Sequence, residues 1–236
     1  MRRNLAKLER MRDFGEILAF VRDIAGQFGV VRQSYHFTPV FEAPTSHNTV
    51  IAAEGFPMEW IALYDSENFL SDDPIPELTL EDGRFLTWEQ AMSRADDSER
   101  VARYISARYA HGLQYGIGMA LFGPRNRTAY ASFGFDEDPA GMSEGKLSLL
   151  HSLMQAAHMQ ICRLLDEQPP EVTLSRREQQ VLEWIGKGKS GTDIAAILGI
   201  SHDTVRTYTR RIFDKLDVTD RVGATVKGLQ MGLIRL

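Results

Sequence analysis

Cysteine is nearly missing from this 236-residue chain, and long apolar runs are missing altogether. Cys162 is the only cysteine, which excludes an intramolecular disulfide and a zinc site built from several thiolates. No stretch approaches the ~20 apolar residues that cross a bilayer. The N-terminal stretch is interrupted by charge and has no signal-peptide core. These absences predict a protein of the reducing cytoplasm that has no membrane partner.

Motifs for catalysis and for cofactors are also missing. The six histidines show no metal-ligand spacing with carboxylates. The chain contains neither a dinucleotide fingerprint nor a P-loop, and no nucleophile is paired with a base. We therefore expect no catalytic residue, no metal and no cofactor. An enzyme of lactone or acyl chemistry is kept as an alternative interpretation of the N-terminal half.

The charge distribution indicates two domains. Residues 171–236 hold 11 Lys/Arg and 8 Asp/Glu, a net charge of +3, so the other residues carry −8 of the total of −5. The two prolines of "DEQPPEV" cannot continue the preceding helix. We predict an N-terminal domain at 1–168, a linker at 169–173 and a C-terminal domain at 174–236.

The C-terminal domain begins with strong helix signals. Ser175 with Glu178 and Ser190 with Asp193 are spaced as capping boxes. The segment "LGIS" then separates two short helical patterns and contains a glycine. This spacing predicts a helix-turn-helix.

The helix expected at about 203–217 carries a cationic face. Arg206 and Arg210 lie four residues apart, away from the apolar stripe of Val205, Ile212 and Leu216. Arginine can donate to both O6 and N7 of guanine, and other cations and threonines suit phosphates. The predicted DNA-binding residues are Lys189, Thr204, Arg206, Thr207, Arg210 and Arg211. The alternative is an ordinary solvated basic face.

The segment "LSRREQQVLEWIGKGKSGTDIAAILGISHDTVRTYTRRIFDKLDVTDRVGATVKG" resembles the DNA-binding domain of the LuxR family of transcription regulators. The resemblance implies four helices, of which the third is the recognition helix. The fourth, expected at about 220–232 with Thr219 as its cap, would contribute to dimer contacts. Gly186, Asp193 and Tyr208 depart from the family pattern without removing a groove-facing cation.

The N-terminal half alternates between helical and strand patterns. Expected helices lie at 4–28, 98–112 and 143–166, with a capping box at Thr87 and Gln90, and strands lie near 31–38, 49–54, 115–122 and 128–135. The pattern predicts an αβα sandwich with an antiparallel sheet, so the whole chain is α+β with an all-α C-terminal domain. A phosphorylated receiver domain would instead show five strand–helix alternations.

Trp60, Tyr64, Asp73-Pro74, Trp88 and Gly116 together resemble the signature of autoinducer-binding domains in quorum-sensing regulators. The resemblance implies an acyl-homoserine lactone as ligand. The indole of Trp60 can donate to the lactone carbonyl, and Asp73 can accept from the ligand amide. Tyr64 and Trp88 would form the walls of the pocket.

One position departs from that signature. Phe56 stands where the family has a tyrosine that donates to the amide carbonyl. Either Ser132 or Tyr64 takes over this contact, or the acyl group is unusual. Asp73 alone could equally be a helix cap before Pro74. Since an unpaired carboxylate in an apolar pocket costs several kcal/mol, we expect the empty pocket to be poorly folded.

The predicted function is therefore a quorum-sensing transcription regulator rather than an enzyme. One helix-turn-helix reads a half-site, so we expect a homodimer on palindromic double-stranded DNA. RNA polymerase would be a further partner of an activator. A response regulator controlled by phosphorylation of an N-terminal aspartate is the alternative. The acyl group, the operator and the direction of regulation stay open.

Overall fold

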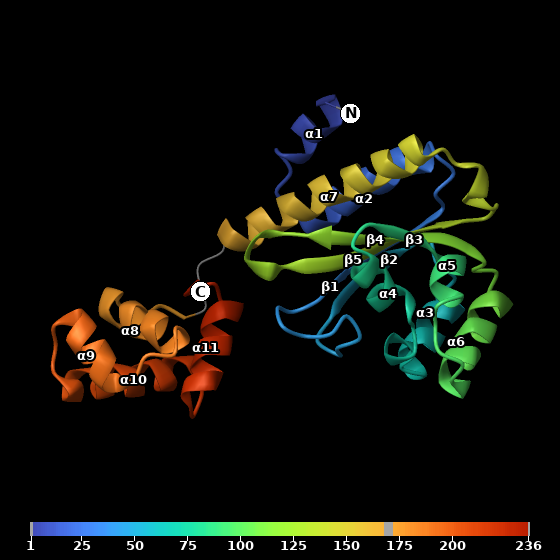
Figure 1. The fold of residues 1–236 in the computed structure, drawn as a ribbon. Coiled ribbons are helices and arrows are strands. Elements are labelled where there is room, and N and C mark those ends of the chain that lie inside the picture. The colour runs from blue at the N-terminus through green and yellow to red at the C-terminus, as the bar shows by residue number, and fades with distance from the viewer. Residues whose placement is uncertain (1, 168–171, 236) are drawn as a thin grey trace. The chain divides into compact units, whose positions relative to one another are not determined.

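The computed structural model describes residues 2–167 and 172–235. These residues form two compact units that divide between Glu167 and Gln168 (Figure 1). The first unit combines helices with an antiparallel sheet and the second is all-helical, which confirms the predicted fold class. Residues 169–171 of the predicted linker lie outside the described residues.

The N-terminal unit is built on a five-stranded antiparallel sheet in the order β2-β1-β5-β4-β3. The strands are β1 (Arg32–Phe37), β2 (Val50–Glu54), β3 (Phe85–Thr87), β4 (Tyr115–Phe122) and β5 (Thr128–Phe135). One face carries α1 (Arg2–Leu8), α2 (Phe14–Gly26) and α7 (Glu144–Glu167), and the other carries α3 (Met58–Ser66), α4 (Ile75–Asp82), α5 (Trp88–Met92) and α6 (Glu99–Ala110) (Figure 1). Short 3₁₀ turns lie at Phe69–Ser71, Pro124–Asn126 and Pro139–Gly141.

The two faces of the sheet support separate cores because side chains alternate along a strand. On β1 and β5, Tyr35, Ala131 and Phe133 are buried against α2 and α7. Tyr130 points to the other face, where it packs in a cluster with Trp60 and Trp88. The predicted αβα sandwich therefore has an aliphatic core on one side and an aromatic core on the other.

The single long helix expected at 4–28 is wrong. The chain forms α1 and α2 with a break between them, because the Asp13 side chain caps α2 by accepting from the backbone N–H of Glu16 at 2.9 Å. An aspartate followed three residues later by a glutamate is itself a helix-start signal. Apolar periodicity alone does not locate this cap.

The C-terminal unit contains α8 (Arg176–Gly186), α9 (Gly191–Leu198), α10 (His202–Leu216) and α11 (Arg221–Gln230). Both predicted capping boxes, at Ser175 and at Ser190, are present. Thr219 is not the cap of the fourth helix: Asp220 caps α11 through the backbone N–H of Gly223. Carboxylates and hydroxyls are both good caps, so neighbouring candidates are hard to separate from sequence.

Gly116 of β4 supports the indole of Trp88, and we expect its replacement to disturb the aromatic core. A Cβ at this position would lie 2.1 Å from Cε2 of Trp88. Gly116→Ala should lower the unfolding free energy of the N-terminal unit by about 1–3 kcal/mol, because overpacking forces the indole to move. Urea unfolding followed by tryptophan fluorescence measures the change.

Gly145→Ala provides the matched control, since a Cβ on this exposed residue of α7 meets no atom within 4 Å. We expect it to cause no loss of stability. Equal losses in the two variants would contradict the specific role of Gly116.

Candidate functional site

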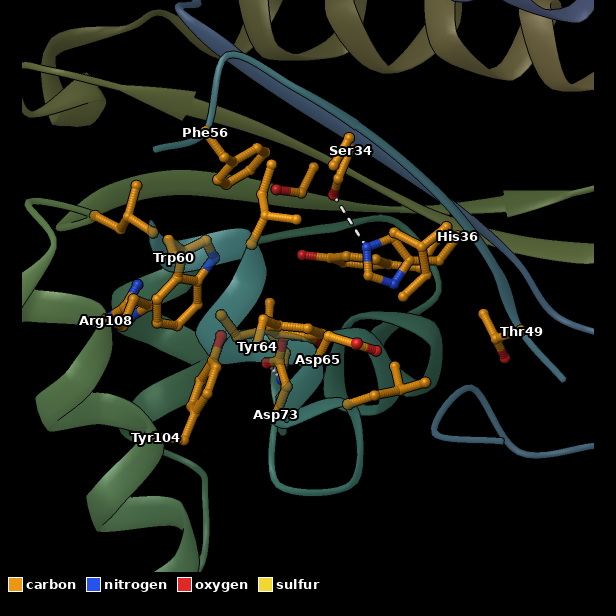
Figure 2. A pocket seen from close by; sticks show the side chains of 18 of the residues that line it. Ser34, His36, Thr49, Phe56, Trp60, Tyr64, Asp65, Asp73, Tyr104 and Arg108 are labelled. Carbon is orange, nitrogen blue, oxygen red and sulfur yellow. Dashed lines mark hydrogen bonds between the residues drawn. The ribbon is translucent and has the colours of Figure 1, made fainter. Parts of the chain in front are cut away.

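A cavity of about 670 Å³ lies between the sheet and helices α3–α6. This volume is typical of sites for small organic molecules. Ser34 and His36 of β1 and Tyr130 and Ser132 of β5 line it from the sheet, because all four point to the same face of the two paired strands. Figure 2 shows Trp60, Tyr64, Asp73 and Tyr104 on the helical side, facing the sheet residues across the cavity.

The Asp73 side chain connects α3 to α4 through hydrogen bonds. Its Oδ1 accepts from the backbone N–H of Ile75 at 2.9 Å, and its Oδ2 accepts from the hydroxyl of Tyr64 at 3.2 Å. Burial raises the pKa of Asp73 to about 6, although the Ile75 N–H, the Tyr104 hydroxyl and the charge of Arg108 act in the opposite direction. The carboxylate therefore has partners, and desolvation still dominates its titration.

These contacts change two of the expectations. Oδ1 accepts from the backbone N–H of Ile75, the first residue of α4, but Pro74 occupies the N-cap position, so Asp73 is not the helix cap of the alternative interpretation. Oδ2 faces Tyr64 in the cavity wall. The carboxylate is thus not left without partners in the absence of a ligand. Poor folding of the ligand-free pocket remains a prediction. An unpaired Asp73 carboxylate no longer supports it, because both oxygens accept hydrogen bonds.

Trp60 lies in a dense group of aromatic side chains. Its ring centroid is 5.7 Å from that of Tyr64, 5.9 Å from that of Phe69 and 6.0 Å from that of Tyr104. The indole is 5% exposed and lines the cavity. Aromatic pairs at these distances stabilise one another beyond their buried area, so the wall of the cavity is held firmly in place.

The structure brings together every predicted ligand residue. Phe56, Trp60, Tyr64, Asp73, Trp88 and Ser132 all line the one cavity. Phe56 has no hydroxyl to donate to the amide carbonyl of the ligand. The Tyr64 hydroxyl already donates to Asp73, so Ser132 is the better candidate for this contact. The contacts of all six residues with a ligand stay predictions.

Other residues of the cavity lining are not predicted from the sequence, among them His36, Tyr130, Tyr104 and Arg108. His36 and Tyr130 face one another at neighbouring strand positions with ring centroids 5.0 Å apart, and burial lowers the pKa of His36 to about 4. Tyr104 and Arg108 project from successive turns of α6. Their four-residue spacing was visible in the sequence, but a tyrosine and an arginine on an amphipathic helix give no sign of which face is buried.

In the C-terminal unit, α10 carries most of the predicted DNA-binding residues. Arg206, Arg210 and Arg211 are exposed, and none of them forms an ion pair with a described residue. Thr204 and Thr207 are partly buried, and their hydroxyls bond to Ser201 and to the Asp203 carbonyl. Lys189 is exposed in the turn before α9. The helix therefore presents unpaired positive charge next to short polar side chains, as a phosphate-rich partner requires.

Lys215 differs from the other cations of α10. Its ammonium donates to Oε2 of Glu178 at 2.7 Å and to the Thr173 carbonyl at 3.2 Å. Burial opposes ionisation of Glu178, but the hydrogen bonds from Lys215 and Ser175 outweigh it and lower the pKa of this carboxyl. Lys215 thus links α10 to α8 and stabilises the fold of the C-terminal unit.

Over residues 2–167 and 172–235, no cluster of histidine, cysteine and acidic side chains is arranged to hold a metal ion. Within the same ranges, no helix is long and apolar enough to cross a membrane.

The fold defines a protein with a small-molecule cavity in its N-terminal unit and a helix-turn-helix in its C-terminal unit. Residues 13–161 match the autoinducer binding domain family, and residues 172–227 match the luxR family of bacterial regulatory proteins. The quorum sensing-dependent transcriptional regulator RpaR of Rhodopseudomonas palustris is 30% identical over 185 residues, which cover 78% of this chain and 75% of RpaR. Regulatory protein SdiA of Escherichia coli is 29% identical over 198 residues, or 81% and 79% of the two chains.

A crystal structure of Escherichia coli SdiA has the same fold, with a TM-score of 0.81 and 25% identity over 100% of this chain and 98% of that chain. The chain belongs to the LuxR family of quorum-sensing transcriptional regulators. It is a DNA-binding regulator with a domain for a small-molecule autoinducer, and not an enzyme.

The raised pKa of Asp73 predicts a pH-dependent stability of the ligand-free protein. The folded state binds the proton more tightly than the unfolded state, whose pKa is near 3.8. Stability should therefore fall as pH rises from about 4 to about 6, by up to about 3 kcal/mol. Asp73→Asn should remove this slope and raise the unfolding free energy by about 1–3 kcal/mol near pH 7.5. Denaturant unfolding of the full chain at several pH values measures both effects.

Asp72 offers a control one residue away, since its carboxylate pairs with Arg100 at 2.6 Å and lies outside the cavity lining. Asp72→Asn should cause a small loss of stability, about 1 kcal/mol or less. A pH slope that survives in Asp73→Asn would show that another group causes it.

Proposed function

We propose that this regulator binds an N-acyl-homoserine lactone in the N-terminal cavity. In this proposal Asp73 accepts from the ligand amide, Trp60 donates to the lactone carbonyl and Ser132 donates to the amide carbonyl. Tyr64, Trp88 and Phe56 enclose the ligand. The observation that carries the proposal is the buried Asp73 carboxylate, which lies with the Trp60 indole in the wall of a cavity of about 670 Å³.

The C-terminal unit is proposed to bind a palindromic promoter site as part of a homodimer. Arg206 and Arg210 would contact base edges, whereas Lys189, Thr204, Thr207 and Arg211 would contact the backbone. The exposed arginines of α10, which form no ion pair with a described residue, support contact with DNA. Val222 and Val226, one turn apart and exposed on α11, support a two-fold contact between copies. We further propose that the protein acts in the cytoplasm and contacts RNA polymerase if it is an activator.

Ligand binding is tested with the full-length chain and a series of straight-chain N-acyl-homoserine lactones. Because ligand binds only the folded state, the bound lactone should add about 2.7 kcal/mol to the stability of the N-terminal unit at a hundredfold excess over Kd. Isothermal titration gives Kd, and calorimetric unfolding gives the stabilisation.

Asp73→Asn is the matched variant for this test, since it keeps the shape of the side chain. It should weaken binding by about tenfold or more, because the ligand amide no longer donates to a charged acceptor. If no lactone of any chain length binds the wild type, the proposed ligand class is wrong.

DNA binding is tested by replacing Arg206. Sites are first selected from random DNA with the full-length protein and ligand, since the operator is unknown. Arg206→Ala should then lower the affinity for the selected site by about 1–3 kcal/mol and relax the preference at one base pair per half-site. Affinity for random DNA should fall much less, and Kd values for both DNAs at constant salt measure the difference.

Arg177→Ala is the control, because Arg177 is equally exposed but lies on α8. It should leave both affinities nearly unchanged. An equal loss on selected and random DNA for Arg206→Ala would assign this arginine to phosphate contact alone.

A further inference from the structure

Arg108 is a buried cation in the cavity wall that has no hydrogen-bond partner among the described residues. The residue is 2% exposed, and Nε and both Nη atoms are buried without an acceptor among the described residues. It forms no ion pair there either. A guanidinium carries five N–H donors, and leaving a buried charged group without acceptors is costly.

The aromatic neighbours of Arg108 compensate only part of this cost. Its Cζ lies 5.2 Å from the ring centroid of Trp88 and 4.9 Å from that of Tyr109. Such contacts stabilise the positive charge over the faces of the rings. They leave the edge of the guanidinium plane, where the N–H groups point, without an acceptor.

Arg108 also lies near the proposed amide site. Its charge lowers the pKa of Asp73 but is not paired with that carboxylate. Figure 2 shows Arg108 on the same side of the cavity as Trp60 and Tyr104, with His36 on the other side. A molecule whose amide N–H reached Asp73 would therefore place the atoms next to that amide toward the cation.

We propose that Arg108 is a specificity-determining residue that donates to the carboxyl oxygens of the ligand head group. The ligand class is an N-acylated amino acid derivative with a carboxyl group one carbon from the amide. This group is an ester in a homoserine lactone and a carboxylate in the ring-opened acid. The inference rests on the proposed function, because the amide at Asp73 sets the orientation of the ligand.

Charge and geometry favour a carboxyl group as the missing partner. The planar fork of a guanidinium matches two oxygens held on one carbon. The indole of Trp60 supplies only one donor, and a carboxyl group has enough lone pairs to accept from both residues. A ring without these oxygens would offer the N–H groups of Arg108 no acceptor.

The test compares two ligands that differ only in these oxygens, N-octanoyl-homoserine lactone and N-octanoyl-cyclopentylamide. The wild-type chain should bind the lactone about tenfold to a hundredfold more tightly. Arg108→Met, which keeps the length of the side chain, should lose most of this preference while its Kd for the cyclopentylamide stays within about threefold. Ring-opened N-octanoyl-homoserine is the third ligand, and binding that depends on Arg108 would identify the free carboxylate as a second source of the same group.

Arg103→Met is the control on the same helix, since the Arg103 side chain is 59% exposed and pairs with Glu67. It should preserve the preference for the lactone. Arg108→Met is expected to fold at least as stably as the wild type, because it removes an unpaired buried charge. If it does not fold, Arg108→Lys should show a partial loss of the preference, since an ammonium lacks the planar fork.

Two negative outcomes are distinguishable. If the wild type binds the lactone and the cyclopentylamide with equal affinity, or if Arg108→Met keeps the wild-type preference for the lactone, this inference is wrong while the proposed function stands. If none of the three N-octanoyl ligands binds the wild type, the comparison is repeated with the acyl chain that binds best in the straight-chain series, and if no chain length binds, the proposed function itself fails.

Discussion

The carboxylate of Asp73 is the constraint around which the ligand-binding half is organised. Its two oxygens accept from a backbone N–H of α4 and from a tyrosine hydroxyl of α3, so one buried side chain links these two helices. Burial without full compensation explains why its pKa rises to about 6. A group that stays poorly solvated despite two hydrogen bonds is suited to accept a third from a small molecule, because no water shell has to be displaced.

Glycine residues of the sheet leave space for the aromatic side chains that line the cavity. Gly116 and Gly118 of β4 lie directly beneath Trp88 and Tyr130, where a Cβ would be at 2.1 Å and 2.7 Å from the rings. The opposite face of the same strands packs against α2 and α7 in an apolar core. One sheet thus serves as an ordinary core on one side and as the wall of a binding cavity on the other. The difference arises from side-chain volume at alternate positions and needs no change in backbone geometry.

The C-terminal unit separates its positive charges by role. Lys215 is used internally to neutralise Glu178, a nearly buried carboxylate that also caps α8. Arg206, Arg210 and Arg211 on the same helix have no such partner among the described residues. A count of basic residues along the sequence does not separate Lys215 from the three arginines. The acidic character of the N-terminal half, at a net charge of −8, favours interaction of nucleic acid with the C-terminal unit alone.

Local chemistry in the sequence determined much of this protein. The capping boxes at Ser175 and Ser190, the paired strands β4 and β5 and the helix-turn-helix follow from signals only a few residues long, and the sequence pattern was sufficient to recognise the family. What only the tertiary structure decided depends on long-range contacts. Tyr64 is committed to Asp73, Lys215 to Glu178, and Arg108 is enclosed without an acceptor among the described residues. Partner choice and burial are set by residues far apart in the chain, and periodicity carries no information on which distant side chains will meet.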